Sequence, residues 1–146
     1  MVQIIIVTHG NHGVEIINSI ELIYNKTNNI KAITLDESES LEEYMDKLNA
    51  EIENSIFHEF LILVDFLGGT PYNATEKLIG KNNVEIITGV NIPMLLKIVQ
   101  MPNQGLKQLA YEAEESGKSG IVNISNLIKK RFQENDLEDS LNEDNI

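Results

Sequence analysis

Short apolar runs alternate with stretches of helical spacing along this 146-residue chain, and this alternation constrains the fold more than any other feature. Two runs, Val2–Thr8 and Glu59–Phe66, are almost continuously apolar, which is typical of strands buried on both faces. Shorter runs lie at Lys31–Leu35 and Val84–Thr88, and a fifth strand candidate lies at Gly120–Ile124. Strands that alternate with helices predict an α/β fold, a doubly wound open sheet of mostly parallel strands with helices on both faces.

Capping residues and prolines indicate where the helices begin. Ser38 or Ser40 is expected to cap the helix after the second strand. Thr70 is expected to cap the next helix, with Pro71 at its first position, and Asn91 is expected to cap the one after that. The expected helices cover about residues 14–23, 41–52, 71–79, 92–99 and 106–115.

The order of the strands decides where a functional site can form. The first and third strands are the most apolar, so we expect them at the centre of the sheet, with right-handed crossovers. If they are adjacent, the order of the four parallel strands is 2-1-3-4 and reverses between them. A crevice then opens at their carboxyl ends.

Those two ends carry groups suited to phosphoryl transfer. His9 ends the first strand, and Asp65 ends the third. A neutral imidazole is nucleophilic through the nitrogen without a proton, and a carboxylate on the other nitrogen fixes the tautomer. The Gly68-Gly69-Thr70 turn offers backbone N–H groups and a hydroxyl to an anion, and Gly10 lets a bulky group approach the ring. The pattern predicts reversible phosphorylation of His9.

Other interpretations of the same residues remain open. Thr70 can be a helix cap alone, and residues 89–93 can be a plain connection or part of a docking or dimer contact. His9, His12 and Asp65 would be an unusual ligand set for a metal. The chain has neither the lysine of a nucleotide-binding P-loop nor a Gly-x-Ser-x-Gly elbow, and without cysteine it has no thiolate chemistry.

Charge limits the classes of partner. The formal net charge is −12, of which −6 comes from the acidic segment 134–146. This balance argues against nucleic-acid binding, which needs basic surface, and is compatible with a basic protein partner. No segment approaches the roughly 20 apolar residues of a membrane span, so we expect a cytoplasmic protein without membrane insertion. The acidic tail is expected to be disordered or only transiently helical.

Three stretches resemble the signature sequences of one family. They are Ile6–Gly10, Val64–Ala74 and Thr88–Leu95, which follow consecutive strands in the family's order and spacing. They are similar to those of the mannose-family EIIA domains of the bacterial phosphoenolpyruvate-dependent sugar phosphotransferase system. The resemblance covers about residues 1–125 and leaves a C-terminal segment, 126–146.

The resemblance implies a dimeric phosphotransferase component that needs no metal or other cofactor. His9 matches the phosphorylated histidine, Asp65 the carboxylate that orients it, and Thr70 a hydroxyl that contacts the phosphoryl group. The family takes the phosphoryl group from HPr and passes it to an EIIB domain, which serves the membrane proteins EIIC and EIID. Its antiparallel edge strand, exchanged across the dimer, would be Gly120–Ile124 here.

Two alternative functions share this fold. One is the phosphoryl-carrying subunit of a dihydroxyacetone kinase. The other is a regulatory sensor, in which the phosphorylation of His9 changes binding to another protein without transport. In the sugar system, selectivity lies in the membrane components, and this chain would never touch the sugar.

Overall fold

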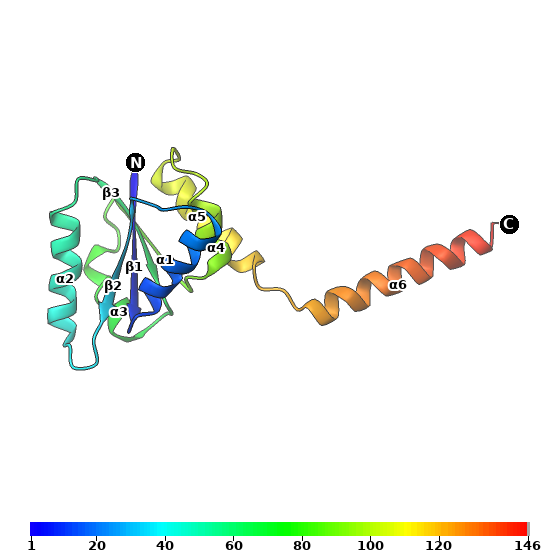
Figure 1. The fold of residues 1–146 in the computed structure, drawn as a ribbon, viewed down its shortest axis with the longest axis horizontal. Helices are drawn as coiled ribbons and strands as arrows, with labels where there is room; N and C mark the ends of the chain where they lie inside the picture. Colours follow the sequence, from blue (N-terminus) through cyan, green and yellow to red (C-terminus); the bar gives the residue numbers. More distant parts are fainter. Residues whose placement is uncertain (146) are drawn as a thin grey trace.

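A four-stranded parallel sheet lies at the centre of the computed structural model, which describes residues 1–145 (Figure 1). The spatial order β2-β1-β3-β4 confirms the predicted order 2-1-3-4. Val7 of β1 is in register with Ile33 of β2 and with Val64 of β3, so the carboxyl ends of the two central strands lie side by side. The strands are β1 (Val2–His9), β2 (Ile30–Leu35), β3 (Glu59–Val64) and β4 (Val84–Thr88).

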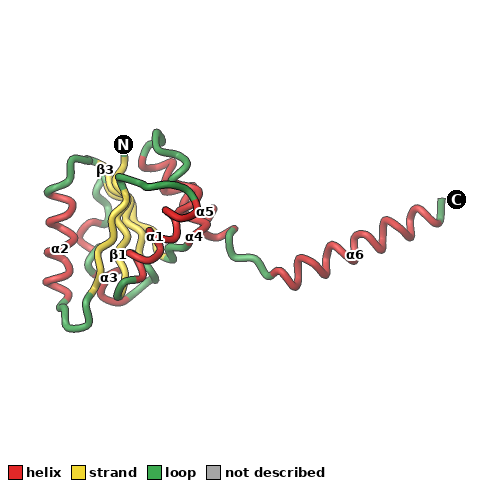
Figure 2. Tube along the Cα trace, viewed as in Figure 1, coloured by secondary structure: helices red, strands yellow, loops and turns green. Residues whose placement is uncertain are grey.

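Helices cover both faces of the sheet, as Figures 1 and 2 show. One face packs against α1 (His12–Ile23), α4 (Ile92–Ile98) and α5 (Leu106–Ser119). The other packs against α2 (Leu41–Glu53) and the short segments α3 (Gly69–Asn73) and η1 (Glu76–Leu78).

Alternate residues of the central strands belong to these two cores. Ile4 and Ile6 face one core, while Ile5 and Val7 face the other. Each of these four side chains is at most 2% exposed. The near-continuous apolar runs in the sequence are therefore explained by burial on both faces.

Two of the predicted helix starts are confirmed and one is wrong. Ser40 and Glu43 form a reciprocal capping box at the start of α2, and the Asn91 side chain accepts a hydrogen bond from the Met94 N–H at the start of α4. Thr70 does not cap α3, because Gly68, with a φ of 99°, occupies the cap position and the helix begins at Gly69. Because glycine readily adopts a positive φ, the cap lies at Gly68, two positions before the predicted cap at Thr70.

The C-terminal part differs from the predicted strand and disordered tail. Residues 121–123 form no strand within residues 1–145, and α6 (Ile124–Glu143) begins at the last residue of the predicted strand. Among residues 1–145 the sheet pairs only β1 to β4, so residues 121–123 are unpaired although Ile121 shares a hollow with β4.

The tail itself is a single long helix. All the residues of α6 are exposed, and Figure 1 shows the helix extending away from the body. The last residue of the expected tail, Ile146, lies outside the described residues. Within residues 1–145, no helix combines the length and the apolar character needed to cross a membrane.

Candidate functional site

His9 and Asp65 meet where β1 and β3 end. The backbone N–H of Asp65 donates to the Val7 carbonyl at 3.3 Å, which continues the pairing of the two strands by one residue. The backbone N–H of His9 in turn donates to Asp65 Oδ2 at 2.9 Å. Strand pairing therefore brings together two side chains that are 56 residues apart in the sequence.

The imidazole of His9 is held through one of its two nitrogens. Its Nδ1 lies 2.8 Å from Asp65 Oδ2, while Asp65 Oδ1 accepts the backbone N–H of Phe66 at 2.9 Å. A carboxylate at Nδ1 favours the tautomer with the proton on that atom. Nε2 is then the nitrogen that carries the free electron pair.

Hydrogen bonding keeps the Asp65 carboxylate ionised. Burial on its own would raise the pKa of Asp65, but the hydrogen bonds from the His9 backbone, the His9 ring and the Phe66 backbone outweigh burial and lower the pKa below its ordinary value. The side chain of Asp65 is 14% exposed and that of His9 is 43% exposed. The carboxylate is thus sheltered, while the nucleophilic ring stays accessible.

The glycine turn after β3 packs closely against the imidazole. A Cβ atom on Gly69 would lie 3.1 Å from His9 Cε1 and 3.3 Å from Nε2, which is tighter than an ordinary contact. Gly68 and Gly69 both have positive φ, as does Gly10 next to His9. Glycine is required in this turn both for its backbone conformation and for the space beside Nε2.

A hollow of about 420 Å³ opens on His9. Thr70 lines it, although no hydrogen bond of the Thr70 hydroxyl is seen, and acidic residues line its far side. The complete lining consists of His9, Gly10, Leu35, Asp36, Glu37, Glu39 and Thr70. Of the predicted site residues, His9, Gly10 and Thr70 line this hollow. Asp65 contacts the His9 ring and Gly69 lies close to it, whereas Gly68 does neither.

Sequence reasoning missed two residues that shape this site. The hydroxyl of Thr8, which is fully buried, accepts the Gly13 N–H at 2.9 Å and fixes the turn between His9 and α1. The ring of Phe66 stacks on the His9 imidazole. A buried threonine that precedes a strand-end histidine was a usable signal for the first residue, whereas the stacking depends on side-chain torsions that no pattern reveals.

Comparison with known proteins identifies the family. The family model EIIA-man, described as "PTS system fructose IIA component", matches residues 3–113. The chain belongs to the EIIA-man family. This finding confirms the resemblance inferred from the three signature stretches.

Individual EIIA components resemble the chain over nearly its whole length. The fructose-specific EIIA component of Bacillus subtilis (strain 168) is 31% identical, over 89% of this chain and 91% of its own. The sorbose-specific EIIA component of Lacticaseibacillus casei is 28% identical, over 92% and 99%. A crystal structure of the phosphotransferase system component EIIA from Streptococcus agalactiae has a TM-score of 0.78 at 30% identity and covers 86% of this chain and 99% of its own. The protein is thus a mannose-family EIIA component of the sugar phosphotransferase system, a class of phosphotransferases.

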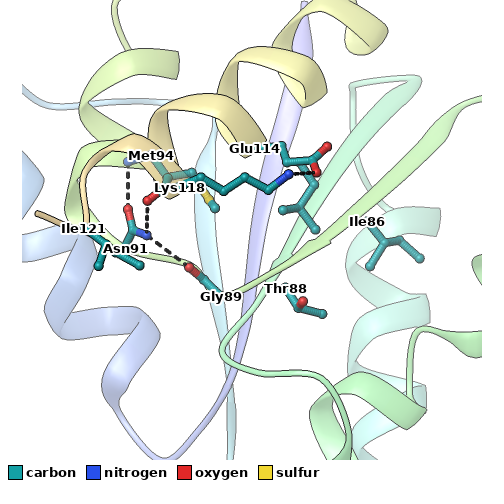
Figure 3. A pocket seen from close by; sticks show the side chains of 10 residues that line it. Ile86, Thr88, Gly89, Asn91, Met94, Glu114, Lys118 and Ile121 are labelled. Atoms are coloured by element: carbon teal, nitrogen blue, oxygen red, sulfur yellow. Dashed lines mark hydrogen bonds and ion pairs between the residues drawn. The ribbon is translucent and has the colours of Figure 1, made fainter.

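A second hollow of this EIIA component, of about 430 Å³, lies away from His9 along β4 (Figure 3). Asn91 lines it, and its side-chain amide donates to the carbonyls of Gly89 and Gly117. Residues 89–93 connect β4 to α4, and Asn91 also joins them to α5; a role in docking or in a dimer contact stays a prediction. Ile121, from the predicted edge strand, also lines this hollow.

The alternative metal site receives no geometric support in this EIIA component. Among residues 1–145, no three histidine, cysteine or acidic side chains are grouped so that they could hold a metal ion. His12 is exposed at the start of α1 and lines a separate hollow with Glu15 and Asn91. The structure therefore does not form the set of His9, His12 and Asp65.

Proposed function

We propose that this EIIA component is a phosphocarrier that accepts a phosphoryl group from phospho-HPr on His9 and donates it to an EIIB component. The observation that carries this proposal is the His9–Asp65 contact of 2.8 Å at Nδ1, which leaves Nε2 as the nucleophile. The EIIA family supports the reaction class, and the His9–Asp65 geometry supports the choice of residue and atom.

The proposed step forms one bond to phosphorus and breaks another. The electron pair of Nε2 attacks phosphorus, while the bond from phosphorus to the donor breaks and its electron pair leaves with the donor. The proton on Nδ1 stays between the ring and Asp65, so the phosphorylated ring carries a positive charge beside the carboxylate. This charge keeps the ring a good leaving group for the reverse step toward EIIB.

The glycine turn is the proposed binding site for the phosphoryl oxygens. Gly69 lies beside Nε2 and Thr70 lines the same hollow, so the proposed donors are the backbone N–H groups of the Gly68–Thr70 turn together with the Thr70 hydroxyl. Gly10 keeps the approach to His9 open, since no Cβ stands there. Positioned N–H donors stabilise the charge on the phosphoryl group during transfer.

The surface around His9 supports docking of proteins with a basic surface. Asp36, Glu37 and Glu39 line the hollow, and Phe66, which stacks on His9, is 53% exposed. Acidic side chains beside an exposed aromatic ring favour a partner that has the opposite charge. HPr and EIIB are the proposed binding partners of this surface. EIIC and EIID act only downstream, in the membrane.

We also propose a homodimer with an exchanged antiparallel edge strand at Gly120–Ile124. β4 is at the edge of the sheet, so its outer backbone groups lack a neighbouring strand in the single chain. Ile121, which is 82% exposed, lines the hollow along that edge, and the next residue, Val122, is 51% exposed. In this proposal residues 1–125 form the phosphocarrier domain and residues 126–146 form a separate tail. The protein acts in the cytoplasm and needs neither a metal nor another cofactor.

Incubation with phosphoenolpyruvate, enzyme I and HPr tests the central assignment. The expected result is an acid-labile mass gain of one phosphate, which His9→Ala abolishes. His58→Ala is the matched control, because His58 is exposed just before β3 at the opposite end of the strand and should leave labelling unchanged. Labelling that persists in His9→Ala would overturn the proposal.

The acceptor is tested in a second step. The relatives named above are sugar-system components, which favours EIIB over the nucleotide subunit of a dihydroxyacetone kinase. Purified phosphoprotein should lose its label to EIIB and keep it when mixed with the kinase subunit. Loss of the label to the kinase subunit alone would instead identify the other system, and loss to neither would favour the regulatory role.

A further inference from the structure

The ring of Phe66 lies flat against the ring of the candidate nucleophile. The two ring centroids are 5.1 Å apart, and the planes are inclined by only 9°. Phe66 directly follows Asp65, and its backbone N–H donates to the same carboxylate that holds Nδ1. The imidazole is therefore contacted by two consecutive residues: Asp65 at Nδ1 and Phe66 at the face of the ring.

The space for this stack depends on a neighbouring glycine. The ideal Cβ of Gly69 would lie 3.1 Å from His9 Cε1 and 3.4 Å from Phe66 Cζ. A Cβ atom at residue 69 would therefore crowd the His9 ring and also touch the edge of the Phe66 ring. Such a dedicated gap indicates that the stack is part of how the site is built.

Asp65 alone leaves the orientation of the imidazole incompletely fixed. A single contact at Nδ1 holds one atom of the ring but still lets the plane tilt about that contact. A parallel aromatic ring restricts this tilt and so directs Nε2 toward the glycine turn. In addition, the electron-rich face of a phenyl ring attracts a positively charged neighbour.

We propose that Phe66 is a positioning residue that fixes the plane of the His9 imidazole and stabilises the positive charge of the ring when Nε2 carries a phosphoryl group. This inference rests on the proposed function of His9. Phe66 is 53% exposed, so its role is not that of a core residue. An aliphatic residue could replace its apolar surface but could not supply an aromatic face.

The test compares Phe66→Leu, Phe66→Tyr and the wild type, with Tyr24→Leu as control. Tyr24 is a partly exposed aromatic residue at the end of α1, far from the carboxyl ends of the strands, so its replacement matches the chemistry of Phe66→Leu. Two readouts need no partner protein. One is the NMR shift of the His9 ring protons, and the other is the lifetime of phosphohistidine formed with phosphoramidate.

In the wild type and in Phe66→Tyr, the His9 ring protons should show the upfield shift that a stacked ring causes, and the phosphohistidine should have the same lifetime in both. Phe66→Leu should lose the upfield shift and shorten the lifetime by about two- to fivefold, which corresponds to the loss of one exposed cation–π contact. Tyr24→Leu should change neither readout.

Equal phosphohistidine lifetimes in Phe66→Leu and the wild type would overturn the proposal. A lifetime in Phe66→Tyr as short as that expected for Phe66→Leu would also overturn it. The absence of the upfield shift in the wild type would also overturn it. These outcomes are separate from the test with HPr. If HPr fails to label the wild type, the proposed function fails, whereas the phosphoramidate and NMR readouts still decide the role of Phe66.

Discussion

The strand-end site and the tail helix α6 are opposite extremes of one chain. At the site, His9, Asp65, Phe66 and Gly69 constrain one another through hydrogen bonds, ring stacking and close packing. In α6, every residue is exposed, including the large apolar side chains. Those side chains are Ile124, Leu127, Ile128, Phe132, Leu137 and Leu141.

The contrast shows what holds each region in place. Tertiary contacts fix the site, so a change in one residue should affect its neighbours. The described hydrogen bonds of α6 are all local: those of its own backbone, the cap in which the Asn123 side chain accepts the Asn126 N–H, and side-chain bonds to carbonyls three or four residues earlier. An isolated helix of this kind is marginally stable in water, so the tail should contribute little to the stability of the body.

A matched pair of leucine substitutions tests this difference with the largest expected effect. Leu63 in β3 is fully buried, and Leu137 in α6 is 62% exposed. Leu63→Ala should lower the free energy of unfolding by about 2–5 kcal/mol, because it leaves a cavity in the core. Leu137→Ala should change it by no more than about 0.5 kcal/mol. Urea unfolding followed by circular dichroism measures both, and similar losses would show that α6 is packed against something.

Asp65→Asn tests how strongly the site is coupled. The amide keeps the shape of the side chain but removes the charge beside Nδ1, so the rate of His9 phosphorylation should fall at least about tenfold. Thr70→Ser is the control, because it keeps the hydroxyl and should keep most of the rate. A wild-type rate in Asp65→Asn would mean that the carboxylate does not orient the ring.

Asp65 also predicts a pH dependence of stability. Since the fold lowers its pKa, Asp65 stabilises the folded state above the ordinary aspartate value of about 3.9, and this contribution is lost as pH falls below that value. Between pH 6 and pH 3, urea midpoints should therefore fall more steeply for the wild type than for Asp65→Asn. Parallel midpoint curves would contradict the lowered pKa.

Removal of the tail should have the smallest effect. A chain that ends at Ser125 retains the predicted edge strand and loses nearly all of α6. Its unfolding free energy, measured at the same protein concentration, should differ from that of the full chain by no more than about 0.5 kcal/mol, and its phosphorylation by HPr should be unchanged. A large loss of either would assign α6 a role in the body or in docking.

The core of the fold was predictable from the sequence because strands buried on both faces leave a strong signal. The apolar runs around Ile5 and Ile62 identified the two central strands, and their adjacency then placed His9 beside Asp65. Ser40 and Asn91 were predictable as caps because each acts on a backbone N–H three residues away.

The errors arose where the outcome depends on context beyond the local pattern. Thr70 has the chemistry of a cap, but the positive φ of Gly68 lets α3 begin before it. The segment at residues 121–123 has the composition of a strand but pairs with none in the single chain, and its exchange across a dimer stays a prediction. The position of Phe66 over His9 depends on side-chain torsions and on the gap at Gly69, which the sequence pattern does not encode.

The most direct test of the central claim is the identity of the phosphorylated atom. Because Asp65 holds Nδ1, the phosphoryl group should be found on Nε2 of His9, and Nδ1 should keep its proton. Heteronuclear NMR of the phosphoprotein, with ¹⁵N-labelled histidine, distinguishes the two nitrogens by their coupling to phosphorus. Phosphorus on Nε2 is the predicted result, and phosphorus on Nδ1 would contradict the proposed role of Asp65.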